Sequence, residues 1–511
     1  MFRLVILILF TISCLYCAER DVTGNLTGQD ILEVQDATQD TGVVKKFSRL
    51  KASGKKIVDE NGNEVRLRGF NIGGYLFLET WVNQIDYTTS ARAYEFAHMS
   101  QYKEEIISAL IDSIPEAKGG DPLPNVCIGN GDGWLEKFRT ELLKRIPESD
   151  TEEFVDELKK YPTICDDSDY KLRQLLYQRF GLAGRDELLL SFIKSWVTES
   201  DIKWIAEQGF NLIRIPIGYR TLTKDVDSPL PEKLTYNEEV FSVIDELLTW
   251  CEKYGVYAVI DLQESPGGHN DYSGLPAYLY ENEKMQELTV ELWKYISRRY
   301  KERDIVAMYS LLAEPMDAPN IEARDSVYDK IVKGIREEGD DHLLVIHDGF
   351  KGMGTLPEPS KYGWTNVVYS THIFEFGVTS LESYKTLISL YDGIYLDAQK
   401  KQNVPYFIGS FSVIKDTDWA YEALSELIKW YEKRRYHWSV WTYKRIDCPV
   451  AKLLYNHSSM WGVRNRLKSE FERADIYLDS KEEIKRKFES YRDIILEPNQ
   501  RMLDILKSFQ K

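Results

Sequence analysis

Basic residues are scarce in this chain of 511 residues, which has 65 Lys and Arg against 82 Asp and Glu and a formal net charge of −17. An acidic surface repels phosphate backbones and anionic headgroups, so we expect no nucleic-acid partner. No apolar stretch after the first 20 residues is long enough to cross a bilayer, so we expect no membrane insertion. Cysteine and histidine are also sparse, with six and seven residues, and no spacing resembles a metal site. We therefore expect neither metal nor cofactor. The 43% of apolar residues and the 13% of aromatic ones still supply a large core.

Long apolar runs are missing too, except for one short run near the beginning of the chain. Arg3 precedes the apolar residues 4–12, and the polar residues 18–21 follow. This pattern predicts a signal peptide over residues 1–18, because the run is too short to cross a bilayer comfortably as an anchor. We expect a flexible leader over residues 19–50 and a protein that is secreted or associated with the cell wall.

Export permits disulfides and glycosylation. Cleavage of the signal peptide leaves Cys127, Cys165, Cys251 and Cys448. Cys127 and Cys165 flank a helical stretch that a disulfide between them would staple, whereas Cys251 lies in a helical pattern and suits a buried free thiol equally well. Asn25 and Asn456 begin N-glycosylation sequons.

Short apolar runs alternate with longer amphipathic stretches over residues 51–465, the pattern of repeated strand–helix units. This alternation predicts a closed (β/α)8 TIM barrel, with an open doubly wound sheet as the competing architecture. The predicted strands are 65–72, 212–216, 256–262, 306–312, 343–347, 367–372, 406–409 and 438–441. The predicted helices are 198–208, 238–253, 284–299, 321–338, 380–401 and 419–434.

Two segments do not fit the strand–helix repeat. Residues 84–195 separate the first two strands by far more than one helix, and amphipathic stretches at 103–114 and 134–146 predict a helical insertion over one end of the barrel. Residues 466–511 predict a C-terminal helical extension, with a mixed-charge helix from 480 to 495 packed outside.

Polar residues stand at the ends of the predicted strands, where a parallel barrel carries its active site. Leu311-Leu312-Ala313-Glu314-Pro315 ends one buried strand in a carboxylate, and proline stops the strand there. Tyr406-Phe407-Ile408-Gly409-Ser410 ends another strand in a serine. Longer motifs at 68–79, 209–219 and 261–270 follow or contain three further strands, and the eighth strand carries Trp438-Ser439-Val440-Trp441.

These motifs, in this order, resemble glycoside hydrolase family 5, most closely its exo-β-1,3-glucanase-like members. The resemblance runs from about residue 55 to about residue 462, interrupted by the insertion, and implies a β-linked oligo- or polysaccharide as partner. In the family, two glutamates on strands four and seven act as acid/base and nucleophile. Position by position, the resemblance implies one acid/base residue and five groups that bind substrate or support the site: Glu314 as the acid/base, and Glu79, Arg214, Asn270, His372 and Trp441.

The departures from the family pattern fall on its chemistry. Ser410 occupies the nucleophile position, and a serine hydroxyl is un-ionised at neutral pH. Ala313, Gln263 and Phe374 replace an asparagine, a histidine and a tyrosine of the family pattern. The resemblance therefore implies a pseudoenzyme that binds a β-glucan or related glycan but is inactive or severely impaired as a retaining glycosidase.

Alternative hypotheses remain open at this point. Glu375 or Glu264 follows a strand end and is a candidate relocated carboxylate for an active β-glucosidase or glucanase. Arg214, without its family glutamate, is expected to pair with Glu314 or Glu79. A third hypothesis makes the barrel a scaffold and the 84–195 insertion a protein-interaction surface.

Overall fold

The computed structural model describes residues 47–509, apart from residues 84, 86–99, 114–130, 161–167, 225–227, 273, 414–416 and 447–461. The predicted signal peptide and most of the leader lie outside the described residues. So do Cys127, Cys165, Cys448 and both sequons. Predictions about these segments stay predictions.

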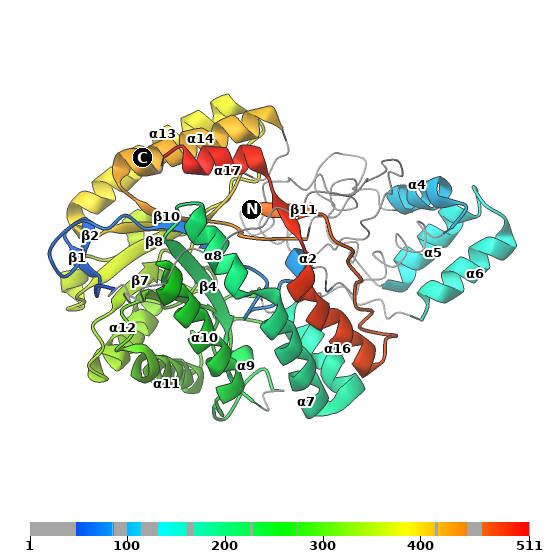
Figure 1. Ribbon diagram of the computed structural model, residues 1–511, viewed down its shortest axis with the longest axis horizontal. Coiled ribbons are helices and arrows are strands. Elements are labelled where there is room, and N and C mark those ends of the chain that lie inside the picture. Colours follow the sequence, from blue (N-terminus) through cyan, green and yellow to red (C-terminus); the bar gives the residue numbers. More distant parts are fainter. Residues whose placement is uncertain are drawn as a thin grey trace, which may run out of the picture.

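Eight parallel strands close into a barrel in the order β10-β3-β4-β5-β6-β7-β8-β9, surrounded by helices (Figure 1). This confirms the (β/α)8 prediction and excludes the open doubly wound sheet, because β10 pairs with both β9 and β3. The strands are β3 (Arg68–Asn71), β4 (Leu212–Gly218), β5 (Tyr257–Glu264), β6 (Val306–Ser310), β7 (Leu343–His347), β8 (Val367–Ile373), β9 (Tyr406–Phe411) and β10 (His437–Val440).

The barrel strands are short apolar runs because both of their faces are covered. Every residue of β4, β6, β7, β8, β9 and β10 is buried. An N-terminal hairpin of β1 (Lys51–Ser53) and β2 (Lys56–Val58) closes one end of the barrel. There Leu50 and Ile57 pack against inward-facing residues such as Val259 and Phe407. The opposite end, where the strands finish, is called the barrel mouth below.

Amphipathic helices connect the strands much as predicted, and side chains cap several of them. Asn282, Asn320 and Ser380 accept hydrogen bonds from the first turns of three helices. Two 3-10 turns, η2 (Met353–Thr355) and η3 (Pro359–Lys361), replace a helix between β7 and β8. The connecting helices are α8 (Glu199–Glu207), α9 (Tyr219–Leu222), α10 (Glu238–Tyr254), α11 (Glu283–Tyr300), α12 (Ile321–Glu337), α13 (Leu381–Gln402) and α14 (Asp418–Arg434). Cys251 in α10 is a buried free thiol, which was one of the two states expected for it from the sequence.

The described parts of the region between β3 and β4 are mainly helical. Its described helices are α2 (Thr80–Asn83), α4 (Lys103–Ser113), α5 (Gly131–Leu142), α6 (Glu148–Leu158) and α7 (Asp169–Trp196). The periodicity predicted α4 and α5 but missed α6 and α7. The 28-residue α7 breaks at Gly181, whose φ of 70° is left-handed, and packs against α10 and α16. In Figure 1, α4, α5 and α6 lie at the edge of the molecule, away from α11 and α12. A role of this region as an interaction surface stays a prediction.

The C-terminal extension contains more strand than expected. An antiparallel pair of β11 (Arg464–Leu467) and β12 (Leu496–Pro498) encloses α16 (Lys481–Glu489) and a 3-10 turn η5 (Ser490–Asp493). The predicted helix over 480–495 is therefore too long, since it ends at Glu489. The last helix, α17 (Gln500–Lys507), packs on α14. Within the described parts of the chain, no helix combines the length and apolar character needed to cross a membrane.

Candidate active site

A buried polar network joins the strand ends at the barrel mouth. The Arg214 guanidinium donates to Asn71 Oδ1 over 2.6 Å and to Asp261 Oδ2 over 2.7 Å. Asn71 in turn donates to the carbonyls of Gly409 and Ser439. The network therefore fixes β3, β4, β5, β9 and β10 relative to one another.

The partner of Arg214 differs from the predicted one. Arg214 forms its ion pair with Asp261, and both side chains are almost completely buried. The prediction that Arg214 pairs with Glu314 or Glu79 is wrong, because Asp261 on the neighbouring strand already neutralises it. The sequence did contain a signal for this pair: Asp261 stands inside the apolar run 258–262, and a buried carboxylate needs a partner of opposite charge.

Glu314 follows β6 and lies in the wall of the mouth. Its φ of 51° is left-handed, a conformation that costs on the order of 1 kcal/mol for a residue with a side chain. His269 Nε2 lies 2.6 Å from the Ala313 carbonyl oxygen, and the Asn270 amide donates to the carbonyls of Ala313 and Glu314. These contacts hold the strained backbone in place. In this structure Asn270 thus supports the strand end that carries Glu314.

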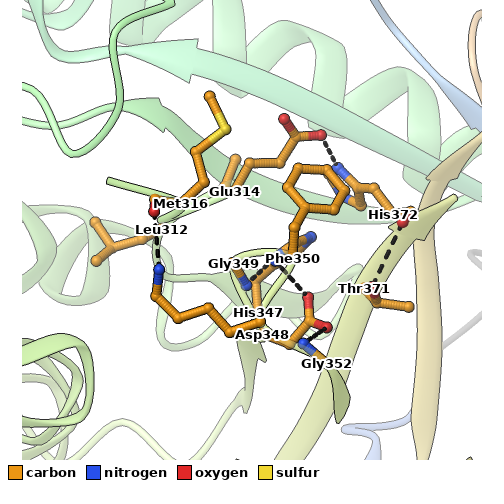
Figure 2. Close-up of polar contacts among 12 residues, drawn as sticks. Leu312, Glu314, Met316, His347, Asp348, Gly349, Phe350, Gly352, Thr371 and His372 are labelled. Atoms are coloured by element: carbon orange, nitrogen blue, oxygen red, sulfur yellow. Dashed lines mark hydrogen bonds and ion pairs between the residues drawn. The ribbon is translucent and has the colours of Figure 1, made fainter. Parts of the chain in front are cut away.

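Glu314 Oε1 forms a short hydrogen bond with His372 Nδ1 from β8 (Figure 2). Burial raises the pKa of the Glu314 carboxyl, while His347, Tyr272 and Arg214 oppose the rise. Burial also lowers the pKa of His372 well below its usual value. The imidazole is therefore neutral near pH 7, with Nδ1 engaged by Glu314.

His347, at the end of β7, packs against His372 with the ring centroids 4.4 Å apart and the planes at 80°. The Gly349 N–H donates to His347 Nδ1 over 2.9 Å (Figure 2), so this nitrogen carries no proton and Nε2 carries it instead. Burial lowers the pKa of His347 well below its usual value. Its Nε2–H has no acceptor in the part of the chain that the structure describes. The sequence motifs did not single out this residue.

Ser410 lies near the end of β9, where its Cα pairs with that of His372. The side chain is buried, and Oγ has no hydrogen-bond partner among the described residues. Gly409 lets the His372 ring approach β9, because a Cβ there would lie 2.8 Å from His372 Nε2. His372 and Ser410 are thus brought together on neighbouring strands.

Glu79 and Trp441 come from the first and eighth strand ends. Burial raises the pKa of Glu79 to about 8, although the Gly74 N–H and Arg214 partly oppose it. The Trp441 ring lies so close to Gly73 that a Cβ there would be 2.9 Å from the indole. Only glycine leaves this room for the ring.

The two candidate relocated carboxylates are both engaged elsewhere. Glu264 forms a buried ion pair with Arg220, whose guanidinium also lies over the rings of Tyr170 and Tyr219. Glu375 accepts a 2.5 Å hydrogen bond from the Tyr391 hydroxyl on α13. Within the described residues, no group of three or more His, Cys, Asp or Glu side chains is arranged to hold a metal ion.

Residues 179–446 match the family described as cellulase (glycosyl hydrolase family 5). The chain belongs to this family. It is 24% identical over 427 residues to a β-xylosidase of Phanerodontia chrysosporium, covering 78% of this chain and 71% of that protein. It is 32% identical over 205 residues to a glucan 1,3-β-glucosidase of Yarrowia lipolytica, covering 38% of this chain and 47% of that protein.

Among solved structures, an endogalactoceramidase aligns with a TM-score of 0.52 at 13% identity, over 90% of this chain and 84% of that one. At this identity the likeness bears on the fold alone. It agrees with the closed barrel.

Proposed function

We propose that this is an exported protein that binds a β-glucan or related β-linked glycan at the barrel mouth and lacks retaining glycosidase activity. One observation carries the proposal: Glu314 meets His372 at the end of β6, while the end of β9 presents Ser410 instead of a second carboxylate. Retaining hydrolysis needs two carboxyl groups about 5–5.5 Å apart across the scissile bond. A serine beside a neutral histidine does not supply the second one.

Unpaired polar groups in the mouth support a sugar as the ligand. Ser410 Oγ, His347 Nε2 and Arg214 Nε are buried and have no partner among the described residues. Leaving such groups unpaired costs roughly 1–3 kcal/mol each, and the hydroxyls of a bound sugar both donate and accept. Trp441 adds an aromatic ring beside Gly73. The relatives are named for β-xyloside and β-1,3-glucan chemistry, which puts β-linked sugars first among candidates.

The contacts of Glu264 and Glu375 favour loss of hydrolysis over its relocation. Glu264 would leave Arg220 as an unpaired buried charge if it turned toward a substrate. Glu375 would give up its bond to Tyr391. Neither carboxylate is poised as a replacement nucleophile.

Calorimetric titration with laminari- and cello-oligosaccharides, beside a hydrolysis assay of several days, tests the proposal. We expect heat of binding with the wild type, weaker binding with Trp441→Ala, and no released sugar. The proposal would be wrong if the wild type hydrolysed the sugars and Glu314→Gln abolished this activity. It would also be wrong if none of the β-linked oligosaccharides bound.

A further inference from the structure

His372 and Ser410 are paired residues near the ends of the neighbouring strands β8 and β9. Neighbouring strands lie about 4.8 Å apart, so two side chains on the same face of such a pair are within reach of each other. His372 Nε2 lies against Gly409, the residue directly before Ser410. Ser410 Oγ has no partner within the described chain, and rotation about χ1 is enough to change its direction.

Glu314 determines what His372 Nε2 can do. Its carboxylate engages Nδ1, which therefore carries the ring proton when Glu314 is ionised. Nε2 is then unprotonated, and it lies against Gly409, the residue before Ser410. A hydroxyl, an imidazole and a carboxylate in this sequence are the components that nucleophilic acyl transfer requires.

We propose that Ser410, His372 and Glu314 act as nucleophile, general base and orienting carboxylate, and that the mouth hydrolyses esters, with O-acylated β-glycans as the natural substrate class. The glycan part of this proposal rests on the proposed function above. The ester part rests on the three side chains alone.

Two buried N–H groups are available to stabilise the negative oxygen that forms on a carbonyl under attack. His347 Nε2 carries the ring proton because Gly349 donates to Nδ1, and no described residue accepts it. The Arg214 Nε–H is also without a partner, although both terminal nitrogens are engaged. A donor fixed in a buried site contributes roughly 100- to 1,000-fold to kcat by stabilising such an oxyanion.

The reaction balances with water as the only co-reactant. Ser410 Oγ bonds to the carbonyl carbon and passes its proton to His372 Nε2, and the carbonyl oxygen becomes an oxyanion. The bond to the sugar oxygen then breaks, and His372 returns the proton to that oxygen. Water attacks the resulting acyl-serine by the same two steps, which releases the carboxylic acid and restores Ser410.

Other buried serines show what a structural hydroxyl does in this fold. Ser439 Oγ, on the adjacent strand, donates to the Gly409 carbonyl over 2.6 Å, and Ser297 Oγ donates to Asp340. Ser410 makes no such bond. A serine kept only for packing would lose nothing as alanine and would avoid the cost of a buried, unpaired hydroxyl.

Labelling of the full chain with a fluorophosphonate, followed by intact mass and peptide mapping, tests the inference. We expect a single adduct on Ser410, no adduct in Ser410→Ala, and a labelling rate about 100-fold lower in His372→Gln. Ser412→Ala, a buried serine two residues further on, is the matched control and should label within about twofold of the wild type. Hydrolysis of p-nitrophenyl acetate and of an acetylated cellobioside should follow the same order.

The inference is overturned if Ser410 stays unlabelled in the wild type, or if a folded Ser410→Ala variant hydrolyses the acetyl esters as fast as the wild type. Circular dichroism and the thermal midpoint establish folding. Calorimetry with unacylated oligosaccharides separates the two proposals. Sugar binding without labelling would refute only the proposed ester hydrolysis. Labelling without sugar binding would refute only the proposed glycan binding.

Discussion

Two buried histidine–carboxylate pairs lie at opposite ends of the barrel. Near the start of β7, His342 Nδ1 lies 2.6 Å from Asp340 Oδ1, and His342 Nε2 lies 3.3 Å from the Arg303 carbonyl oxygen. Ser297 Oγ also donates to Asp340. Both ring nitrogens thus have partners, and hydrogen bonds lower the pKa of Asp340 although burial opposes them.

The second pair, His372 and Glu314, lies at the mouth and is incomplete. Nδ1 of His372 meets Glu314, but Nε2 makes no hydrogen bond to any described residue. Burial dominates here, and the pKa of Glu314 is raised rather than lowered. A histidine and a carboxylate therefore form a satisfied structural pair at one end of the barrel and a pair with an unpaired ring nitrogen at the other. The difference lies in how many of their polar atoms the protein itself satisfies.

The largest effect is expected from adding a carboxylate to the mouth. Ser410→Glu places a negative charge opposite Glu314 and gives Arg214 Nε an acceptor, so the variant should fold and gain weak hydrolysis of an aryl β-glucoside. We expect on the order of 100-fold above the parent's background, and roughly tenfold more when Ala313→Asn is added to bind the sugar 2-hydroxyl. Initial rates of chromophore release measure both gains.

Ser410→Gln is the matched control for this gain, since it has the same size and no charge, and it should stay inactive. A double variant that folds and binds sugar without turnover above the parent would show that the mouth differs from a glycosidase site in more than these positions.

Removing the carboxylate of each pair should change the free energy of unfolding by different amounts. Asp340→Asn should lower the free energy of unfolding by about 3 kcal/mol, because three hydrogen bonds in a buried site depend on the carboxylate. Glu314→Gln should change it by less than about 1 kcal/mol, because an amide still accepts from His372 and removes a buried charge. Urea unfolding at pH 7 measures both. Equal losses would mean that the mouth pair is structural too.

The smallest effect concerns pH and Glu79. Its pKa is raised from 4.5 to about 8, so the folded state favours the protonated carboxyl. This contribution to stability is fully present below pH 4.5 and is lost as the pH rises through about 8. Glu79→Gln should match the wild type at pH 5 and exceed it by on the order of 2 kcal/mol at pH 8.5, less than the full shift implies because the side chain is partly exposed.

Asp340 makes the stability depend on pH in the opposite direction from Glu79. Its lowered pKa adds stability above the ordinary value of 3.8, and this is lost as the pH falls through the folded-state pKa. Urea unfolding between pH 3 and 9 compares the two. A Glu79→Gln curve parallel to the wild type would contradict the raised pKa.

The fold was predictable because periodicity reports burial. Strands buried on both faces appear as continuous apolar runs, and the eight runs found in the sequence are the eight barrel strands. Prediction failed where local pattern competes with tertiary packing. The amphipathic face of α7 is disguised by the break at Gly181, and the predicted helix after Ser480 stops at Glu489 because β12 pairs with β11.

The candidate site was predictable in its positions and not in its contacts. Glu314, His372 and Ser410 stand at strand ends in the sequence, but only the register of β8 and β9 brings His372 beside Ser410. The Asp261 partner of Arg214 and the tautomer of His347 depend on distances between strands. A single sequence does not carry those distances.

We propose above that the barrel mouth binds a β-linked glycan without cleaving its glycosidic bonds. A crystal structure of the wild type after prolonged incubation with a laminari-oligosaccharide tests this most directly. We expect an uncleaved sugar against Trp441, with hydroxyls hydrogen-bonded to Ser410 Oγ and His347 Nε2. A shortened sugar, a sugar bonded covalently to a carboxylate, or a ligand bound only outside the mouth would contradict it.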